Sequence, residues 1–498
     1  GRMVLVTNAH VVASFTSVRV RKFGEVTKFK AKPLLIAHTA DLALLEVEDA
    51  QFWRGVEPLE FGELPKLYTN VAVVGYPFGG ESGCVTRGVV SRVDTTTYAR
   101  GAEALLVVQI DAAINAGNSG GPALDDDFHV AGVAFSGYAG TADNVGFVIP
   151  RSVVENVLKD ISSSTRWPGL CNLGVTTQTC ENAALRRRLG AEDFVPNGIL
   201  VTRVAALGCG KKGGLRSGDV ILSIAGVPVA NDGTVPLRKS TERVGYDHVV
   251  SSRRRGDHVE VEVLRDARAL TLSVTLAPLP RLVPLLDGFD ASPSYVIVAG
   301  LVFMALSFPL VAAVTDDSDD EEEDDSRGSS ELLTVFDKDK PDEDTQIVVW
   351  TQTLAHDCNF GYEKLCRKLP RLRRFNGTTV KNLAHLAFLA GFRAPPPPKK
   401  AAGEFFEFEF VPAHAAAPAE PTLVVVDRKL AVDAQKQILR RAKIPAPFSP
   451  DLKPALRAFS PDKKTAPPED DVWEDALDEE EPERPKDPPP VKRRTPSE

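Results

Sequence analysis

The sequence predicts a mainly β chain in which a barrel-type domain is followed by two smaller α+β domains and a disordered tail. Short β-branched runs alternate with Gly, Pro and Asp turns over the first 150 residues, which is typical of antiparallel barrels or sandwiches. A length of 498 residues suits several domains, each with its own core. Proline and charged residues dominate from residue 445 onward, which predicts disorder over 445–498.

Charge and cysteine content narrow the classes of function. The formal net charge of -9 argues against general nucleic-acid binding. The six cysteines form no C-x-x-C pair and show no zinc spacing, so we interpret them as free thiols in a reducing compartment. No P-loop is present, and the sequence therefore predicts chemistry without ATP, metal or cofactor.

Three polar residues of the first domain suggest a hydrolytic site. His10 ends a β-branched apolar run, and Asp41 stands at the head of another. Ser119 lies within the glycine-rich stretch Gly117–Pro122, where backbone N–H groups can converge on a carbonyl oxygen. Taken singly, each has a structural explanation, such as a turn that closes a hairpin. The ordered set of His, Asp and Ser favours a catalytic triad.

Three motifs carry a family resemblance. They are Thr7-Asn8-Ala9-His10, Asp41-Leu42-Ala43-Leu44 and Gly117-Asn118-Ser119-Gly120-Gly121-Pro122. Together they resemble the Deg/HtrA branch of the trypsin-like serine proteases, and their order is that of chymotrypsin. The resemblance implies two perpendicular six-stranded barrels over residues 1–163. Because the family has barrel strands before its histidine and this chain begins at Gly1, we expect an incomplete first barrel and an N-terminally truncated sequence.

The resemblance also assigns a role to each site residue. Ser119 is the expected nucleophile, His10 the general base, and Asp41 the carboxylate that orients the imidazole. The backbone N–H groups of Gly117 and Ser119 form the expected oxyanion hole. The implied activity is that of an ATP-independent serine endopeptidase that cleaves unfolded or regulatory proteins and assembles as a homo-oligomer. The alternative is a catalytically inactive scaffold that only binds other proteins.

Residues 168–280 are expected to form a peptide-binding domain. A Gly218-Asp219 turn leads into an apolar strand and a second glycine turn, which resembles the signature of a PDZ domain. The resemblance implies that Leu173, Gly174 and Val175 receive a peptide end, and that residues 232–236 open the helix beside the peptide groove. The alternative is a generic α/β module that packs on the protease.

A second PDZ-like domain is expected over residues 293–444. Its first segment, Tyr295–Val314, carries no charge over 20 residues, long enough for a membrane helix. Pro309, Gly300 and many β-branched residues favour a buried hairpin instead, so a membrane span is not preferred. The acidic run within 315–330 indicates a solvated insertion. A basic cluster near Lys492 favours the nucleus, with chloroplast or mitochondrion as alternatives.

Overall fold

The computed structural model describes residues 2–13, 15–77, 82–98, 104–137, 145–160, 167–191, 198–238, 242–285, 289, 291–316, 338–392, 403–412 and 420–458. The chain divides into two compact units. The first comprises residues 1–293, 306–347 and 413–417, and the second comprises 294–305, 348–412 and 418–498. The predicted acidic insertion lies outside the described residues from 317, and the predicted tail lies outside them from 459.

A four-stranded antiparallel sheet, in the order β1-β4-β3-β2, opens the first domain. Its strands are β1 (Leu5–Thr7), β2 (Val18–Arg21), β3 (Lys28–Ala37) and β4 (Leu42–Glu46). The short helix α1 (Ala9–Val12) follows β1, and the 3₁₀ turn η1 (His38–Ala40) joins β3 to β4. Within the described residues this is an open four-stranded sheet, where the sequence predicted a first barrel that lacks strands.

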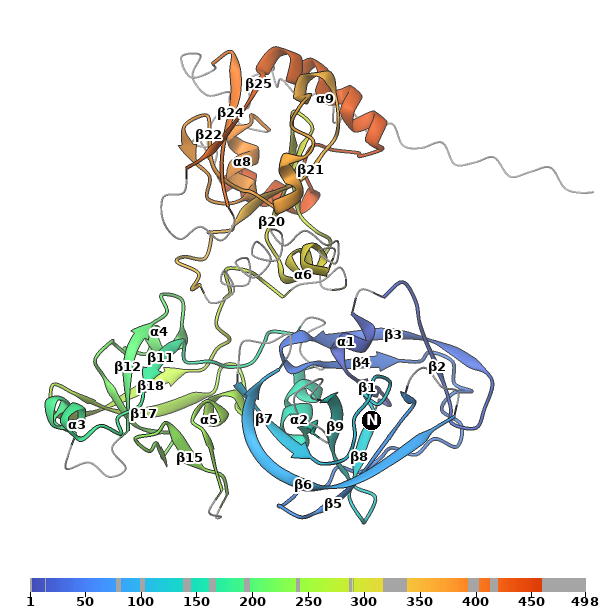
Figure 1. Cartoon of the computed structure of the whole chain (residues 1–498), viewed down its shortest axis with the longest axis vertical. Coiled ribbons are helices and arrows are strands. Elements are labelled where there is room, and N and C mark those ends of the chain that lie inside the picture. The colour runs from blue at the N-terminus through green and yellow to red at the C-terminus, as the bar shows by residue number, and fades with distance from the viewer. Residues whose placement is uncertain are drawn as a thin grey trace, which may run out of the picture. The chain divides into compact units, whose positions relative to one another are not determined.

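Six further strands close into a barrel, in the order β10-β7-β6-β5-β8-β9 (Figure 1). They are β5 (Asn70–Gly75), β6 (Cys84–Thr97), β7 (Ala104–Ile110), β8 (Pro122–Leu124), β9 (Val130–Gly137) and β10 (Gly146–Pro150). Their apolar alternation buries one face of each strand, and Val73, Val108 and Ala123 lie in the core. The helix α2 (Arg151–Asp160) then packs on β9 and β10. The predicted serine stretch connects β7 to β8.

Within the described residues, the second domain contains a six-stranded sheet, a separate two-stranded sheet and three helices. Its elements are β11 (Val175–Gln178), α3 (Ala183–Leu189), β12 (Ile199–Val204), α4 (Cys209–Lys212), β13 (Val220–Ile224), β14 (Val227–Pro228), β15 (Thr234–Pro236), β16 (Arg243–Gly245), α5 (Asp247–Ser251), β17 (His258–Arg265) and β18 (Arg268–Thr275). The sheet order is β11-β12-β13-β17-β18, with β14 beside β13. The strand β11 is therefore an edge.

The predicted helix at residues 232–236 is wrong. The Asp232 carboxylate accepts a hydrogen bond from the Thr234 amide at 2.9 Å, which closes a turn. Strand β15 follows and pairs with β16, so that Val235 and Val244 face each other and are both buried. The helix in this region is α5, which starts at Asp247. Cross-strand burial of two valines thus outweighs a helix start at the aspartate.

A buried ion pair links the Gly-Asp turn of the second domain to β17. Arg265 donates to both carboxylate oxygens of Asp219, at 2.6 and 2.7 Å. Asp219 is almost fully buried and also accepts from the Arg216 amide. This bidentate geometry fixes the turn that leads into β13.

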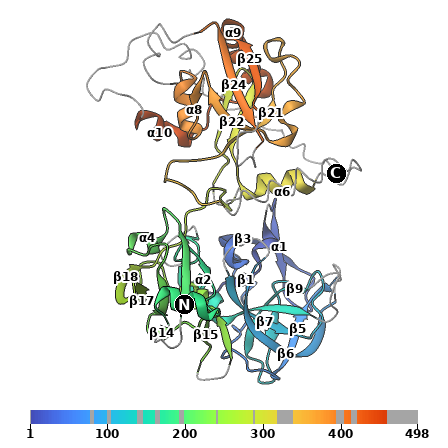
Figure 2. The same ribbon diagram turned by 60° about the vertical axis from the view of Figure 1, so that its left-hand side comes forward.

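The second unit contains a seven-stranded sheet (Figure 2). Its core is rich in aromatic side chains. Its elements are β19 (Tyr295–Val298), β20 (Leu301–Ala305), β21 (Val348–Thr353), β22 (Arg371–Phe375), β23 (Thr378–Thr379), α8 (Leu383–Leu389), β24 (Phe405–Val411), β25 (Thr422–Asp427), α9 (Arg428–Ala442) and α10 (Lys453–Ala458). Phe303, Phe408 and Phe410 stack on one another. The predicted Asn-Gly hairpin joins β22 to β23, with both turn residues in the left-handed region.

The uncharged segment Tyr295–Val314 forms a hairpin and the start of a helix. Strands β19 and β20 pair across residues 299 and 300, and α6 (Phe308–Asp316) follows. The preference for a hairpin is confirmed. Among the helices that the structure describes, none is both long and apolar enough to cross a membrane.

The fold continues beyond residue 444, so the predicted start of the tail at 445 is wrong. Phe448 is only 2% exposed and its ring packs 5.7 Å from that of Phe392. The Ile297 amide donates to the Pro447 carbonyl, and the Ser449 amide donates to the Tyr295 carbonyl. The segment therefore lies along the outer edge of β19, and a proline-rich composition concealed this buried contact.

Candidate active site

His10 and Asp41 are held together at the first sheet. His10 Nδ1 lies 2.7 Å from Asp41 Oδ2, and the His10 amide donates to Asp41 Oδ1 at 3.0 Å. Because an ionised carboxylate only accepts hydrogen bonds, Nδ1 carries the proton and Nε2 is left to accept one. Asp41 is 5% exposed, whereas the His10 ring is partly exposed. This arrangement orients an imidazole toward solvent with its basic nitrogen outward.

The backbone at Asp41 adopts an unusual conformation. Asp41 has φ of 47°, in the left-handed region that costs energy for a residue with a side chain. Its amide donates to the His38 carbonyl at 3.2 Å, and its carbonyl accepts from Asn8 Nδ2 at 2.8 Å. Asn8 belongs to the motif Thr7-Asn8-Ala9-His10, but the sequence analysis predicted no role for it. Its place two residues before the histidine is the feature that could have indicated a role at the site.

The serine stretch is packed against the elements that carry the histidine. A Cβ atom on Gly120 would meet Thr7 Oγ1 at 2.3 Å, and one on Gly117 would meet the Tyr76 carbonyl oxygen at 2.1 Å. Both glycines have positive φ, 103° for Gly117 and 86° for Gly120. Only glycine fits at these two positions. The close approach to Thr7 brings the serine stretch to the end of β1, three residues before His10.

The Ser119 hydroxyl makes its hydrogen bond away from the imidazole. Its hydroxyl donates to the Phe135 carbonyl at 3.4 Å, which is long for an O–H···O bond. Among the described residues no hydrogen bond joins Ser119 to His10. Because the observed bond is weak, a rotation of the serine side chain costs little.

Two backbone N–H groups of the serine stretch have no acceptor among the described residues. The amides of Asn118, Gly120 and Gly121 donate to the carbonyls of Asn115, Ala134 and Asn118. Those of Gly117 and Ser119 donate to no residue that the structure describes. Unsatisfied N–H groups beside a serine hydroxyl are available to a developing oxyanion.

Two buried aromatic residues, Tyr98 and Phe135, pack together near Asp41. Burial raises the pKa of Tyr98, and the negative charge of Asp41 adds to the rise. The Tyr98 hydroxyl donates to the Leu106 carbonyl at 2.6 Å, and its ring lies 4.6 Å from that of Phe135. Tyr98 therefore remains neutral, and it excludes water from this side of the site.

The three predicted peptide-binding residues have different positions. Leu173 is buried and its carbonyl accepts from the Gly210 amide at 2.9 Å. The Gly174 amide donates to Asn172 Oδ1, and the Gly174 carbonyl accepts from Ala205. Only Val175 lies on the edge strand β11. The backbone groups of Gly174 are therefore already used within the domain.

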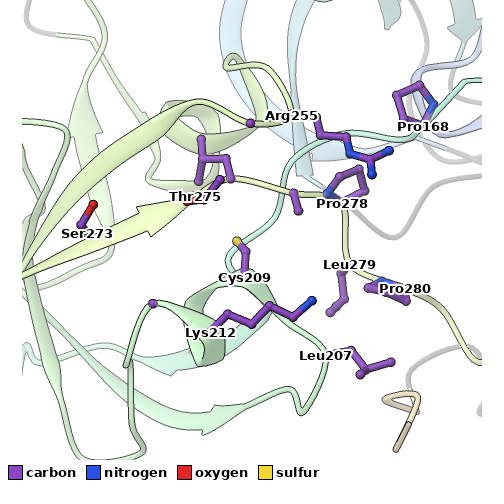
Figure 3. Close-up of a pocket in the computed structure, with 14 residues that line it drawn as sticks. Pro168, Leu207, Cys209, Lys212, Arg255, Ser273, Thr275, Pro278, Leu279 and Pro280 are labelled. Atoms are coloured by element: carbon purple, nitrogen blue, oxygen red, sulfur yellow. The ribbon is translucent and has the colours of Figure 1, made fainter. Parts of the chain in front are cut away.

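A separate hollow of about 660 Å³ lies on the second domain, away from β11 (Figure 3). It is lined by residues of α4, by the end of β18, and by the chain segments that precede and follow the domain in sequence. Lys212 and Arg255 are exposed, so ordinary solvation accounts for their charges. Within the described part of the chain, no group of three or more His, Cys, Asp or Glu residues could hold a metal ion.

Family comparisons assign each domain. A trypsin-like peptidase domain matches residues 1–133, and PDZ domains match residues 171–276 and 283–451. "Protease Do-like 2, chloroplastic" of Arabidopsis thaliana is 39% identical over 451 residues, covering 90% of this chain and 69% of that protein. The chain belongs to the Deg/HtrA family of trypsin-like serine proteases with PDZ domains. The recognition and the fold class predicted from the sequence are thereby confirmed.

Further Deg/HtrA relatives from the same plant are similar over most of the chain. "Protease Do-like 4, mitochondrial" is 38% identical over 78% of this chain and 70% of its own length. "Putative protease Do-like 3, mitochondrial" is 36% identical over 91% and 74%. Among solved structures, "HtrA-type protease AlgW with decapeptide" has 27% identity and a TM-score of 0.44, covering 56% of this chain and 80% of that one. The predicted preference for the nucleus finds no support among these relatives.

Proposed function

We propose that this Deg/HtrA protein is an ATP-independent serine endopeptidase with His10, Asp41 and Ser119 as its triad. His10 Nε2 takes the Ser119 proton as the hydroxyl attacks a peptide carbonyl, and later returns it to the leaving amine. Asp41 holds the imidazole and stabilises its charged form. The N–H groups of Gly117 and Ser119 receive the oxyanion. Water then hydrolyses the acyl-enzyme.

The observation that carries this proposal is the 2.7 Å contact between His10 and Asp41, beside a serine stretch in which two N–H groups have no acceptor among the described residues. In the resting arrangement Ser119 points to Phe135, so catalysis requires the serine to turn toward His10. Substrate binding supplies a reason for that turn, since catalytic hydrogen bonds often tighten only in the complex.

Casein digestion tests the proposal. We expect Ser119→Ala and His10→Ala to reduce kcat by a factor on the order of 10³ or more, because the nucleophile and its base act as a unit. Asp41→Asn should reduce it by roughly 10³ to 10⁴. Equal casein loss in the wild type and Ser119→Ala would leave a non-catalytic scaffold as the better description.

We also propose that the first PDZ domain binds an extended peptide at the edge of β11. Among the described strands only β12 pairs with β11, so its other side is open to a further strand. Binding of a labelled unfolded peptide to Ser119→Ala, measured by fluorescence anisotropy, tests this. Hydrogen exchange must slow in residues 175–178 on binding. Protection elsewhere without protection of β11 would contradict the proposed edge.

A homo-oligomer is the proposed assembly. Phe23 and Val26, in the turn between β2 and β3, are 79% and 88% exposed. Large apolar side chains at this exposure suit contact with a second copy. Light scattering of Phe23→Ser/Val26→Ser should give a smaller mass than the wild type. Phe360→Ser, 83% exposed in the second unit, is the matched control.

A chloroplast or mitochondrion is the proposed compartment, on the strength of the names of the plant relatives. A fluorescent fusion to the complete coding sequence tests it. Accumulation in the nucleus would contradict the proposal.

A further inference from the structure

The segment that joins the protease domain to the first PDZ domain contacts the turn that carries Asp41. Trp167 Nε1–H donates to Thr39 Oγ1 at 2.9 Å. Thr39 is the central residue of η1, and Asp41 follows that turn directly. Residues 128 positions apart in sequence thus meet two residues before the aspartate that contacts His10.

This contact acts on a strained backbone. Asp41 must keep φ of 47° for its carboxylate to meet both the ring and the amide of His10. Two hydrogen bonds already hold the turn: the Asp41 N–H donates to the His38 carbonyl, and Asn8 Nδ2 donates to the Asp41 carbonyl. Trp167 provides a side-chain tether to the turn itself. A residue keeps φ and ψ angles outside the commonly allowed regions only when several surrounding contacts fix its backbone.

Trp167 is itself anchored on both sides. Its ring packs against the apolar cluster that includes Leu42 and Leu44, which follow Asp41 in β4. Four residues later, Cys171 pairs with Pro278 of the first PDZ domain. Pro168, next to Trp167, lines the hollow on that domain (Figure 3). A span of at most about 14 Å therefore connects the Asp41 turn to the PDZ sheet.

We infer that Trp167 and Thr39 are positioning residues of the proposed triad, so that the interdomain segment is part of the catalytic scaffold. This rests on the proposed function. The indole N–H keeps η1 in the conformation that aims Asp41 at His10, and substrate does not contact either side chain. The predicted domain boundary at residue 163 would exclude Trp167 from the domain whose site it supports.

Two conservative substitutions test this in the full chain. Trp167→Phe keeps a ring but removes the N–H, and Thr39→Val keeps the shape but removes the hydroxyl. Each should reduce kcat by about three- to tenfold with KM unchanged, since one neutral hydrogen bond is lost. The double variant should fall no further than either single variant, because both remove the same bond.

Trp53→Phe is the matched control. Trp53 Nε1 donates to the Val47 carbonyl at 2.8 Å, just beyond the end of β4 and away from η1. Its removal should change kcat by less than about twofold, although it loses a hydrogen bond of the same kind. Equal effects of Trp53→Phe and Trp167→Phe, or additive losses in the double variant, would overturn the inference.

A spectroscopic reading separates this inference from the proposed function. His10 Nδ1 lies 2.7 Å from Asp41 Oδ2, so we expect its proton to exchange slowly with solvent, at a rate that proton NMR measures. We expect about three- to tenfold faster exchange in Trp167→Phe and no change in Trp53→Phe. If the wild type cleaves casein no faster than Ser119→Ala, the proposed function fails. Unchanged exchange in Trp167→Phe would instead overturn the positioning role alone.

Discussion

The two PDZ domains differ in what pairs with one of their edge strands. In the first, β11 pairs only with β12 among the described strands. In the second, the outer edge of β19 already accepts and donates hydrogen bonds to residues 447 and 449 of its own chain. An unpaired edge is a template for another strand, and a covered edge is not. Among the described residues, the edge at β11 is thus unpaired and the edge at β19 is covered.

Their cores are also stabilised by different means. The first PDZ domain combines β-branched residues with the buried pair of Asp219 and Arg265. The second depends on stacked rings, including Phe303, Trp350 and Phe410. Stacked phenyl rings have no polar atoms that require hydrogen-bond partners. A buried carboxylate, in contrast, is stable only when its oxygens are paired with donors. The stability of the first domain should therefore depend more on charge substitutions, and that of the second more on substitutions that shorten buried side chains.

The largest expected effect is at the covered edge. Phe448→Ala removes a buried ring from the second domain and should lower its free energy of unfolding by about 3–5 kcal/mol. Urea denaturation followed by Trp350 emission measures this. Phe360→Ala, at an exposed ring of the same domain, should cost less than about 0.5 kcal/mol. A loss at Phe448 as small as that at Phe360 would show that the edge is not held by this residue.

A charge substitution should affect the first PDZ domain next most strongly. Asp219→Asn leaves Arg265 without its carboxylate and should cost about 2–3 kcal/mol, less than for a fully buried pair because Arg265 is partly exposed. The comparison is Glu409→Gln in the second domain, whose 3.7 Å pair with Arg374 is partly exposed. It should cost about 0–1 kcal/mol. Domain-resolved hydrogen exchange measures both, and similar losses would contradict the comparison.

The smallest effect is a pH response of opposite sign in the two domains. Burial raises the pKa of Asp247 in the first from 3.8 to about 6, so the folded state retains a proton that the unfolded chain releases. The contribution of Asp247 to the free energy of unfolding therefore decreases as pH rises from about 4 to 6. Asp247→Asn should thus stabilise the first unit by about 1–3 kcal/mol at pH 8 and leave it unchanged near pH 3.

In the second domain, burial lowers the pKa of His385 from 6.5, and the charge of Lys381 adds to this. The unfolded chain then takes up a proton that the folded state refuses. Stability from this group is lost as pH falls below about 6.5. His385→Gln should therefore stabilise the second unit at pH 5 but not at pH 8, in urea titrations at both values. A gain at pH 8 only would reverse the expected sign.

The sequence alone determined the family, the order of the domains and the residues of the candidate site. Each depends on local patterns: glycines around Ser119, and polar residues at the ends of apolar strands, as with His10 and Asp41. The hairpin at Asn376-Gly377 was equally readable, because its turn needs positive φ at two positions. Such features are encoded within a few residues.

Only the tertiary structure decided which distant residues meet. The contact of Trp167 with Thr39, the burial of Phe448 against Phe392, and the internal use of the Gly174 amide all join segments that no local pattern relates. A proline-rich composition predicted disorder at 445–458, yet one buried ring and two backbone hydrogen bonds order that segment. Burial depends on what the rest of the chain places opposite a residue, and that information is not local.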